Sequence, residues 1–408
     1  MNKDVLKKYA EVIIKIGSNV QKDDEVVIRA DVNSHEFIPY LAQAAYQAGA
    51  KKVTTLFGSE KLMRLRYLNE SVEALTDIPD WRVKSMEYIV EKDAAYIYIV
   101  SDDPQAFMDV NPDKMAAYSK ANRSKLINFY DATMNNDVRW TIAAYPSVEW
   151  ASKVFPNDNP KDAYDKLSKL IQKAMRLDVE DSYQAWKQHQ ELLNKRVEYL
   201  NSANFKALKY KNSLGTDLYV ELPDNYIFMG GADKSKGRTF MANLPTEEVF
   251  TAPKKLSAQG TLVASMPLIH NGAMIKDFSL TFENGKVVDF KAEQGQEILK
   301  NILDIDEGAK YLGEIALVPF DSPIQKMNTL FLNTLYDENA SCHFALGKAY
   351  PCIKDADKLT KEELIQAGIN DSLEHVDFMI GTQDLGITGI TQDGQEIKFF
   401  KNGNFDIK

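Results

Sequence analysis

The sequence predicts two domains of different fold class. The first, over residues 1–200, is an α/β domain with a largely parallel sheet covered by helices, and the second, over residues 201–408, is a mainly antiparallel α+β domain. Three observations support this prediction. A chain of 408 residues is too long for one ordinary core. Strand and helix patterns alternate in the first half, and short strands separated by turn signals fill the second.

The first domain begins with a helical pattern of apolar residues over 4–17. Strand patterns follow at residues 25–30, 52–57, 94–100 and 140–146, with a helical pattern at 35–48 and further helix-forming stretches between them. The run 94–100 is continuously apolar, which is typical of a buried strand in a parallel sheet. Residues 160–200 contain almost no Gly or Pro and predict two helices, the second ending near Tyr199.

After Asn204 the pattern changes to short strands. These are predicted at residues 206–210, 217–222, 261–265 and 278–282. Asn-Gly pairs, the strongest hairpin signal in a sequence, stand at 271–272 and 284–285. We therefore expect a boundary near residue 200, and we expect the second domain to carry the functional site described below.

Composition excludes some classes of function. The formal net charge of −10 argues against a nucleic-acid partner, which normally requires a basic surface. No apolar run approaches the roughly 18 residues of a membrane span, and the N-terminal residues lack a secretory pattern, so we expect a cytoplasmic protein without a membrane partner. Cys342 and Cys352 are the only cysteines, so a disulfide framework is not expected.

Acidic and imidazole side chains interrupt several strand-like segments of the second domain. His375 and Asp377 are two residues apart, so in a strand both leave the same face. Glu248 and Glu314 have the strand parity of apolar neighbours, Phe250 and Leu312 among them, and Glu247 is the expected solvent-facing neighbour of Glu248. Ionised carboxylates in apolar strands are costly unless a cation holds them. A divalent-metal site is therefore predicted.

Each of these residues also has a simpler interpretation. Either glutamate alone could reach solvent from a strand end, and a lone histidine such as His343 is more often a packed residue than a ligand. Their joint occurrence favours a metal site. Ligation by oxygen atoms and two imidazoles suits Zn²⁺, Co²⁺ or Mn²⁺. Five or six ligands exceed the needs of one tetrahedral ion and fit two ions roughly 3.5–4 Å apart.

Other enzyme classes lack their usual motifs. Neither a P-loop nor a Gly-x-Ser-x-Gly elbow is present. Another dinuclear metallohydrolase, an amidohydrolase or a phosphoesterase, could use the same carboxylates and imidazoles. For anion contacts it would have only the polar segment 230–238, which we expect to be a loop near the site. A non-catalytic, metal-stabilised binding module is the remaining alternative.

At the same residues the sequence strongly resembles the aminopeptidase T / aminopeptidase S / PepS family of metallopeptidases. The resemblance covers nearly the whole chain, and its specific motifs lie in the second half. They are the segments 243–253, 313–314, 337–347, 349–351 and 375–379.

The resemblance implies a homodimeric exopeptidase that acts on peptides with a free N-terminus and has a two-metal site in its C-terminal domain. Tyr350 is the implied catalytic residue. A packing tyrosine before a proline is the alternative interpretation of this residue. The implied metal ligands are Glu248, Glu314, Glu338, His343, His375 and Asp377. Glu338 and His343 fit neither one strand face nor one helix face, so a turn is expected to present Glu338.

Overall fold

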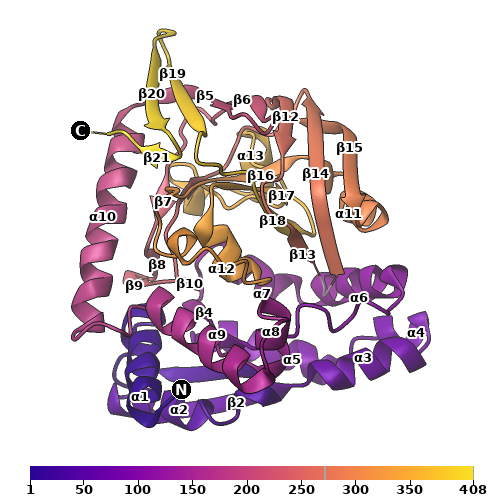
Figure 1. The fold of residues 1–408 in the computed structure, drawn as a ribbon, viewed down its shortest axis with the longest axis vertical. Coiled ribbons are helices and arrows are strands. Elements are labelled where there is room, and N and C mark those ends of the chain that lie inside the picture. Colours follow the sequence, from indigo (N-terminus) through magenta and orange to yellow (C-terminus); the bar gives the residue numbers. More distant parts are fainter. Residues whose placement is uncertain (271–272, 408) are drawn as a thin grey trace. The chain divides into compact units, whose positions relative to one another are not determined.

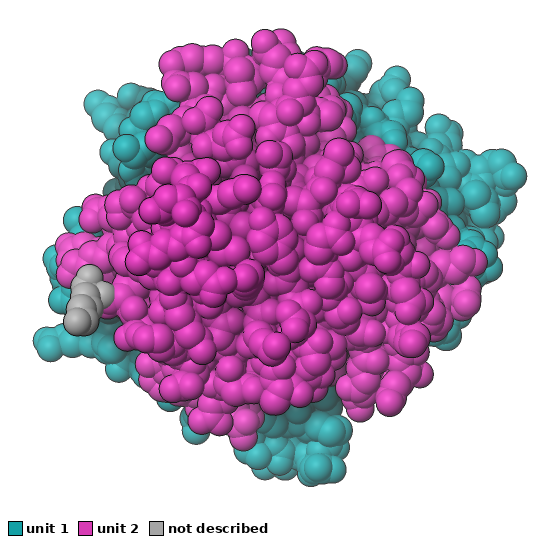
Figure 2. Space-filling model, turned by 90° about the horizontal axis from the view of Figure 1, so that it is seen from above, with its two compact units in different colours: residues 1–190, 232–246, 329–331 teal, residues 191–231, 247–328, 332–408 magenta. Residues whose placement is uncertain are grey.

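The structure of the protein is a computed structural model that describes residues 1–270 and 273–407. The chain divides into two compact units, which Figure 2 shows in different colours. Unit 1 comprises residues 1–190, 232–246 and 329–331, and unit 2 comprises 191–231, 247–328 and 332–408. The chain therefore passes between the units several times, rather than once near residue 200.

Unit 1 is built on a parallel sheet with strand order β10-β4-β3-β1-β2. Its strands are β1 (Glu25–Asp31), β2 (Lys52–Gly58), β3 (Ala95–Val100), β4 (Trp140–Ala144) and β10 (Asn243–Leu244). The last strand explains the return of residues 232–246 to this unit, because Asn243 lies beside Ile142 of β4. The predicted parallel sheet of the N-terminal half is confirmed.

Helices cover this sheet, as Figure 1 shows. They are α1 (Lys3–Val12), α2 (Ile38–Gln47), α3 (Glu60–Asn69), α4 (Val72–Thr76), α5 (Asp80–Glu91), α6 (Pro112–Lys125), α7 (Ile127–Met134), α8 (Val148–Val154) and α9 (Pro160–Ala174), and α10 (Ser182–Ser202) begins in this unit. The helix predicted over 4–17 is α1 followed by a π-helical turn, Ile13–Gly17. None of the helices in the described ranges is both long and apolar enough to cross a membrane.

The larger sheet of unit 2 is antiparallel and has nine strands. They are β5 (Phe205–Lys211), β6 (Asp217–Glu221), β12 (Gln259–Val263), β13 (Leu268–His270), β14 (Ala273–Glu283), β15 (Lys286–Gln294), β19 (Gly386–Thr391), β20 (Glu396–Lys401) and β21 (Asn404–Phe405). Asn284 and Gly285, both with positive φ, form the predicted hairpin turn between β14 and β15. The hairpin predicted at 271–272 lies outside the described residues.

The smaller sheet of unit 2 has five antiparallel strands in the order β18-β17-β16-β11-β7. They are β7 (Met229–Gly230), β11 (Val249–Thr251), β16 (Leu312–Leu317), β17 (His343–Gly347) and β18 (His375–Met379). Short helices α11 (Gln296–Leu303), α12 (Thr334–Asp337) and α13 (Lys361–Gln366) complete the unit.

One face of the smaller sheet packs against the larger sheet. Phe344 of β17 contacts Tyr210 of β5, with ring centroids 5.0 Å apart, and Phe378 of β18 lies 5.7 Å from Phe278 of β14. Apolar residues of both sheets form a single buried core. Because side chains alternate along a strand, every second residue of β16, β17 and β18 must leave the opposite face.

A β-bulge at Gly313 sets which residues of β16 reach that opposite face. Leu312 pairs with Leu346, whereas Glu314 pairs with Ala345, so the register shifts between them. Leu312 consequently joins the core and Glu314 does not. The predicted shared parity of Leu312 and Glu314 is therefore wrong, because a bulge inserts one residue and reverses the alternation.

Gly313→Ala is expected to lower the free energy of unfolding by about 1–3 kcal/mol, the usual cost of overpacking. A Cβ at this position would lie 2.4 Å from the carbonyl oxygen of Gly347 and 2.6 Å from that of Lys348, which are backbone atoms that cannot easily move. Denaturant unfolding measures the effect. Gly58→Ala is the control, since nothing lies within 4 Å of its added Cβ. Equal stability of Gly313→Ala and wild type would contradict the role assigned to the bulge.

Candidate metal centre

Most of the predicted ligands leave the face of the smaller sheet that points away from the core. Glu314 lies on β16, His343 on β17, and His375 and Asp377 on β18. Cross-strand neighbours share a face, and the register places Glu314 opposite Ala345, which is in turn opposite Asp377. The intervening Ala345 is small, so the longer side chains can meet above it.

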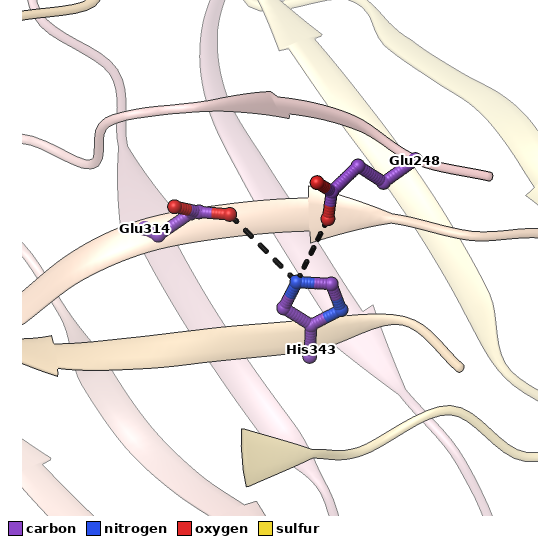
Figure 3. A group of neighbouring side chains, drawn as sticks. All are labelled: Glu248, Glu314 and His343. Carbon is purple, nitrogen blue, oxygen red and sulfur yellow. Dashed lines mark ion pairs between the residues drawn. The ribbon is translucent and has the colours of Figure 1, made fainter. Parts of the chain in front are cut away.

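Glu248, Glu314 and His343 form a first group, shown in Figure 3. Nε2 of His343 lies 3.0 Å from Oε2 of Glu248 and 3.7 Å from Oε1 of Glu314. Glu248 precedes β11 rather than lying within it, and it reaches the group from the strand's N-terminal end. All three residues are buried.

Glu314, His375 and Asp377 form a second group. Nε2 of His375 lies 3.1 Å from Oδ1 of Asp377 and 3.4 Å from Oε2 of Glu314. Glu314 therefore turns one carboxylate oxygen toward each histidine and belongs to both groups. The predicted same-face arrangement of His375 and Asp377 is confirmed by their contact.

Both imidazoles are oriented by a backbone carbonyl. Nδ1 of His343 lies 3.0 Å from the carbonyl oxygen of Ser341, and Nδ1 of His375 lies 2.6 Å from that of Lys348. A hydrogen bond donated by Nδ1 fixes the ring and leaves the Nε2 lone pair directed at the carboxylates when the ring is neutral. Metal-binding histidines in proteins commonly have this second contact. No local sequence pattern indicates these backbone partners.

The donor atoms fit a bound cation. Oε2 of Glu248 and Oδ1 of Asp377 are buried and receive no hydrogen bond from the described residues, although each lies close to an Nε2 atom. With both Nδ1 atoms donating to carbonyls, each carboxylate oxygen faces a nitrogen lone pair. Two acceptors this close repel each other unless a proton or a cation lies between them. Oxygen and imidazole donors of this kind suit divalent ions such as Zn²⁺.

The ionisation of the groups is strongly coupled. Burial alone would lower the pKa of His375, but the adjacent negative charges of Asp377 and Glu314 raise the pKa to about 9. Burial likewise opposes protonation of His343, and Glu248 and Glu314 nevertheless hold its pKa well above the usual value. Burial raises the pKa of Glu314, and the charges of Asp377 and Glu248 add to this. Positive charge at the Nε2 atoms is thus favoured.

Glu338 and Tyr350 lie beside the two groups without belonging to them. Glu338 is buried in a turn of 3₁₀-helix, as expected, and its pKa is raised well above the usual value by burial and by the charges of Asp377 and Glu248. The ring of Tyr350 lies edge-on to the imidazole of His375, with centroids 5.6 Å apart, and 5.5 Å from the ring of Phe250. Tyr350 thus borders the second group.

Two other predictions are corrected by the structure. Glu247 is only 2% exposed rather than solvent-facing, because it precedes β11 and its backbone N–H donates to Oδ1 of Asn339. The segment 230–238 is not a loop. It contains the β8–β9 hairpin (Asp233–Ser235 and Arg238–Phe240), in which Lys236 pairs with Asp93 and Arg238 pairs with Asp24 of unit 1.

The two cysteines are buried free thiols. Sγ of Cys342 donates to the carbonyl oxygen of Val318 and accepts from its N–H, at 3.2 and 3.4 Å. Cys342 belongs to neither ligand group. Its structural role as a small packing residue, expected of a buried cysteine, follows from these contacts.

Several known proteins are similar to this chain over nearly its whole length. Residues 2–405 match the family of thermophilic metalloproteases (M29). Aminopeptidase AmpS of Bacillus subtilis is 41% identical over 402 residues, 98% of each chain, and aminopeptidase 2 of Geobacillus stearothermophilus is 42% identical over 402 residues, 98% of this chain and 97% of that one. The solved structure of AmpT from Thermus thermophilus superposes with a TM-score of 0.91 at 36% identity, covering 99% of this chain and 100% of that chain. The chain therefore belongs to the M29 family of metalloproteases and is a metallo-aminopeptidase, as the resemblance of its motifs predicts.

Proposed function

We propose that this enzyme removes the N-terminal residue of peptides at a centre of two divalent ions, with Glu314 as the bridging carboxylate. One observation carries the proposal: Glu314 directs one oxygen to the imidazole of each group. Glu248 and His343 would complete one ion's ligands, and His375 and Asp377 the other's. Zn²⁺, Co²⁺ and Mn²⁺ all suit these donors.

The ions would lower the pKa of a bound water, so that hydroxide is available near neutral pH. The surrounding acidic side chains attract the free α-amino group of the peptide, which restricts cleavage to the first peptide bond. The hydroxyl of Tyr350 donates a hydrogen bond to the oxygen of the attacked carbonyl as negative charge develops there. We assign proton transfer to the leaving amine to Glu338 rather than Glu314, because Glu314 is shared by both ligand groups.

The described contacts of the segment 230–238 do not favour the phosphoesterase alternative. Such an enzyme would need cationic side chains directed at a phosphate, and two basic residues of the segment 230–238, Lys236 and Arg238, are already paired with Asp93 and Asp24. We further propose a homodimer, on the resemblance of the motifs, and a cytoplasmic location, since the two buried free thiols fit a reducing compartment.

Removal of metal should abolish hydrolysis of amino-acid arylamides, and added Zn²⁺ or Co²⁺ should restore it. Dialysis against a chelator followed by an activity assay measures this. N-acetylated substrates serve as the control, because an enzyme that binds a free α-amino group should reject them. Full activity in protein shown to contain no metal would refute the proposal, and cleavage of acetylated substrates would refute the aminopeptidase assignment of the site.

Glu314→Gln should weaken binding of both ions, whereas Asp377→Asn should weaken binding of one. The reason is that Glu314 contributes to both groups and Asp377 to only the second. Metal titration of the depleted variants, followed by elemental analysis, gives the number of ions retained. Glu396→Gln is the control, since its side chain on β20 is 57% exposed and pairs with Lys209 of β5. Loss of a single ion in Glu314→Gln would rule out the bridging role.

Tyr350→Phe should lower kcat by roughly 10²–10³, the typical cost of losing one oxyanion donor. Metal content should stay at the wild-type value, because the ring contacts with Phe250 and His375 do not need the hydroxyl. Steady-state kinetics and elemental analysis test both statements. Tyr219→Phe, which removes a hydroxyl that bonds Glu221, is the matched control. Unchanged kcat in Tyr350→Phe would mean that Tyr350 is a packing residue.

A further inference from the structure

Asn339 is a fully buried side chain between two segments that carry predicted site residues. Its Oδ1 accepts a hydrogen bond of 2.7 Å from the backbone N–H of Glu247. Its Nδ2 donates to the carbonyl oxygen of Leu335 at 2.9 Å and to Oε1 of Glu338 at 3.3 Å. One carboxamide group thus contacts the residue before Glu248 and the carboxylate of Glu338.

The segment that presents Glu248 needs such an anchor. Strand β11 begins only at Val249, so Glu247 and Glu248 lie before its ladder of hydrogen bonds. The bond from Asn339 lies directly before Glu248 in the chain, and it therefore fixes the direction from which Glu248 approaches His343. A shift of the Glu247 backbone would move the carboxylate of Glu248 with it.

The carboxamide of Asn339 also constrains the side chain of Glu338. Glu338 adjoins Asn339 in a single turn of 3₁₀-helix (Glu338–Ala340), and a buried carboxylate in so short an element can adopt several directions. The hydrogen bond from Nδ2 of Asn339 holds the Glu338 side chain in the direction in which its Oε1 faces the carboxamide. A carboxamide carries an acceptor and a donor on one planar group, so it can make both contacts at once.

We propose that Asn339 is a positioning residue for the metal centre, setting the directions of Glu248 and Glu338 through its two-sided hydrogen bonding. The inference rests on the proposed function, because it assumes that Glu248 holds an ion. The hydrogen bonds of Asn339 described above involve the backbones of Glu247 and Leu335 and the carboxylate of Glu338, so its effect on an ion held by Glu248 acts through these neighbours. Partners in this outer position typically change metal affinity by about 10–100-fold when they are lost.

The variant Asn339→Asp distinguishes the effect of lost positioning on metal affinity from the effect of an added charge. Aspartate has the same shape and can still accept from Glu247, but it has no donor and turns an oxygen toward Leu335 and Glu338. The added negative charge alone would strengthen cation binding, whereas loss of position weakens it. We expect Zn²⁺ affinity, measured by competition with a chromophoric chelator, to fall about tenfold or more.

Asn201→Asp, at an exposed position, is the control for loss of a carboxamide bridge. Asn201 also bridges backbone atoms with both ends of its carboxamide, accepting from the N–H of Phe228 and donating to its carbonyl oxygen. Both variants should lower the melting temperature of the metal-depleted protein. Only Asn339→Asp should also reduce the rise in melting temperature that Zn²⁺ produces, a readout that a merely structural role would leave unchanged.

Wild-type or tighter Zn²⁺ affinity in Asn339→Asp would overturn the inference. If that variant fails to fold, Asn339→Ser, which is smaller and uncharged, should show the same loss of affinity, and wild-type affinity there would overturn the inference equally. Failure of the proposed function gives a different result, since the wild-type protein would then bind no Zn²⁺ under the same conditions.

Discussion

Carboxylates lose most of their hydration when they are buried, and a group of them is stable only if positive charge or hydrogen-bond donors replace the water. Glu314 and Asp377 lie on one sheet face with two imidazoles, Glu248 reaches them from the end of β11, and two of the carboxylate oxygens receive no hydrogen bond from the described residues. The other features of the site follow from this need of buried carboxylates for positive charge or hydrogen-bond donors. Protons on the imidazoles or divalent cations can satisfy these oxygens, and the fixed Nδ1 contacts leave the Nε2 positions open to either.

The two faces of the smaller sheet have different roles, and this separation allows one of them to carry polar residues. The core side of the smaller sheet supplies stability through apolar contacts with the larger sheet, including the ring pairs of Phe344 and Phe378. The other side is then available for polar residues whose burial would weaken a core. Successive side chains of β17 and β18 point to opposite faces of the sheet. Each histidine on the polar face is therefore next to a core residue in the sequence.

Much of this arrangement could be predicted from the sequence. The period-two placement of His375 and Asp377 in an apolar strand is a local signal, and so is the Asn284-Gly285 turn. The bulge at Gly313 could not be predicted, because glycine in a strand has several interpretations and the clash with the Gly347 carbonyl is a long-range contact. The burial of Glu247 likewise depends on a long-range contact, since its partner Asn339 lies 92 residues away.

The return of residues 232–246 to unit 1 also depends on a distant pairing, that of β10 with β4. No local pattern predicts which sheet a two-residue strand will join. The proposed ligand residues could be chosen only by combining their joint occurrence with the family resemblance, because Glu314, Glu338 and His343 each have an ordinary interpretation alone. Their convergence in space is the part that the structure supplies.

Anomalous diffraction at the absorption edge of a bound metal is the most direct measurement of the central claim. The account predicts two peaks, one within bonding distance of Glu248, Glu314 and His343, and the other within bonding distance of Glu314, His375 and Asp377. A single peak that does not contact Glu314, or peaks at other residues only, would contradict it.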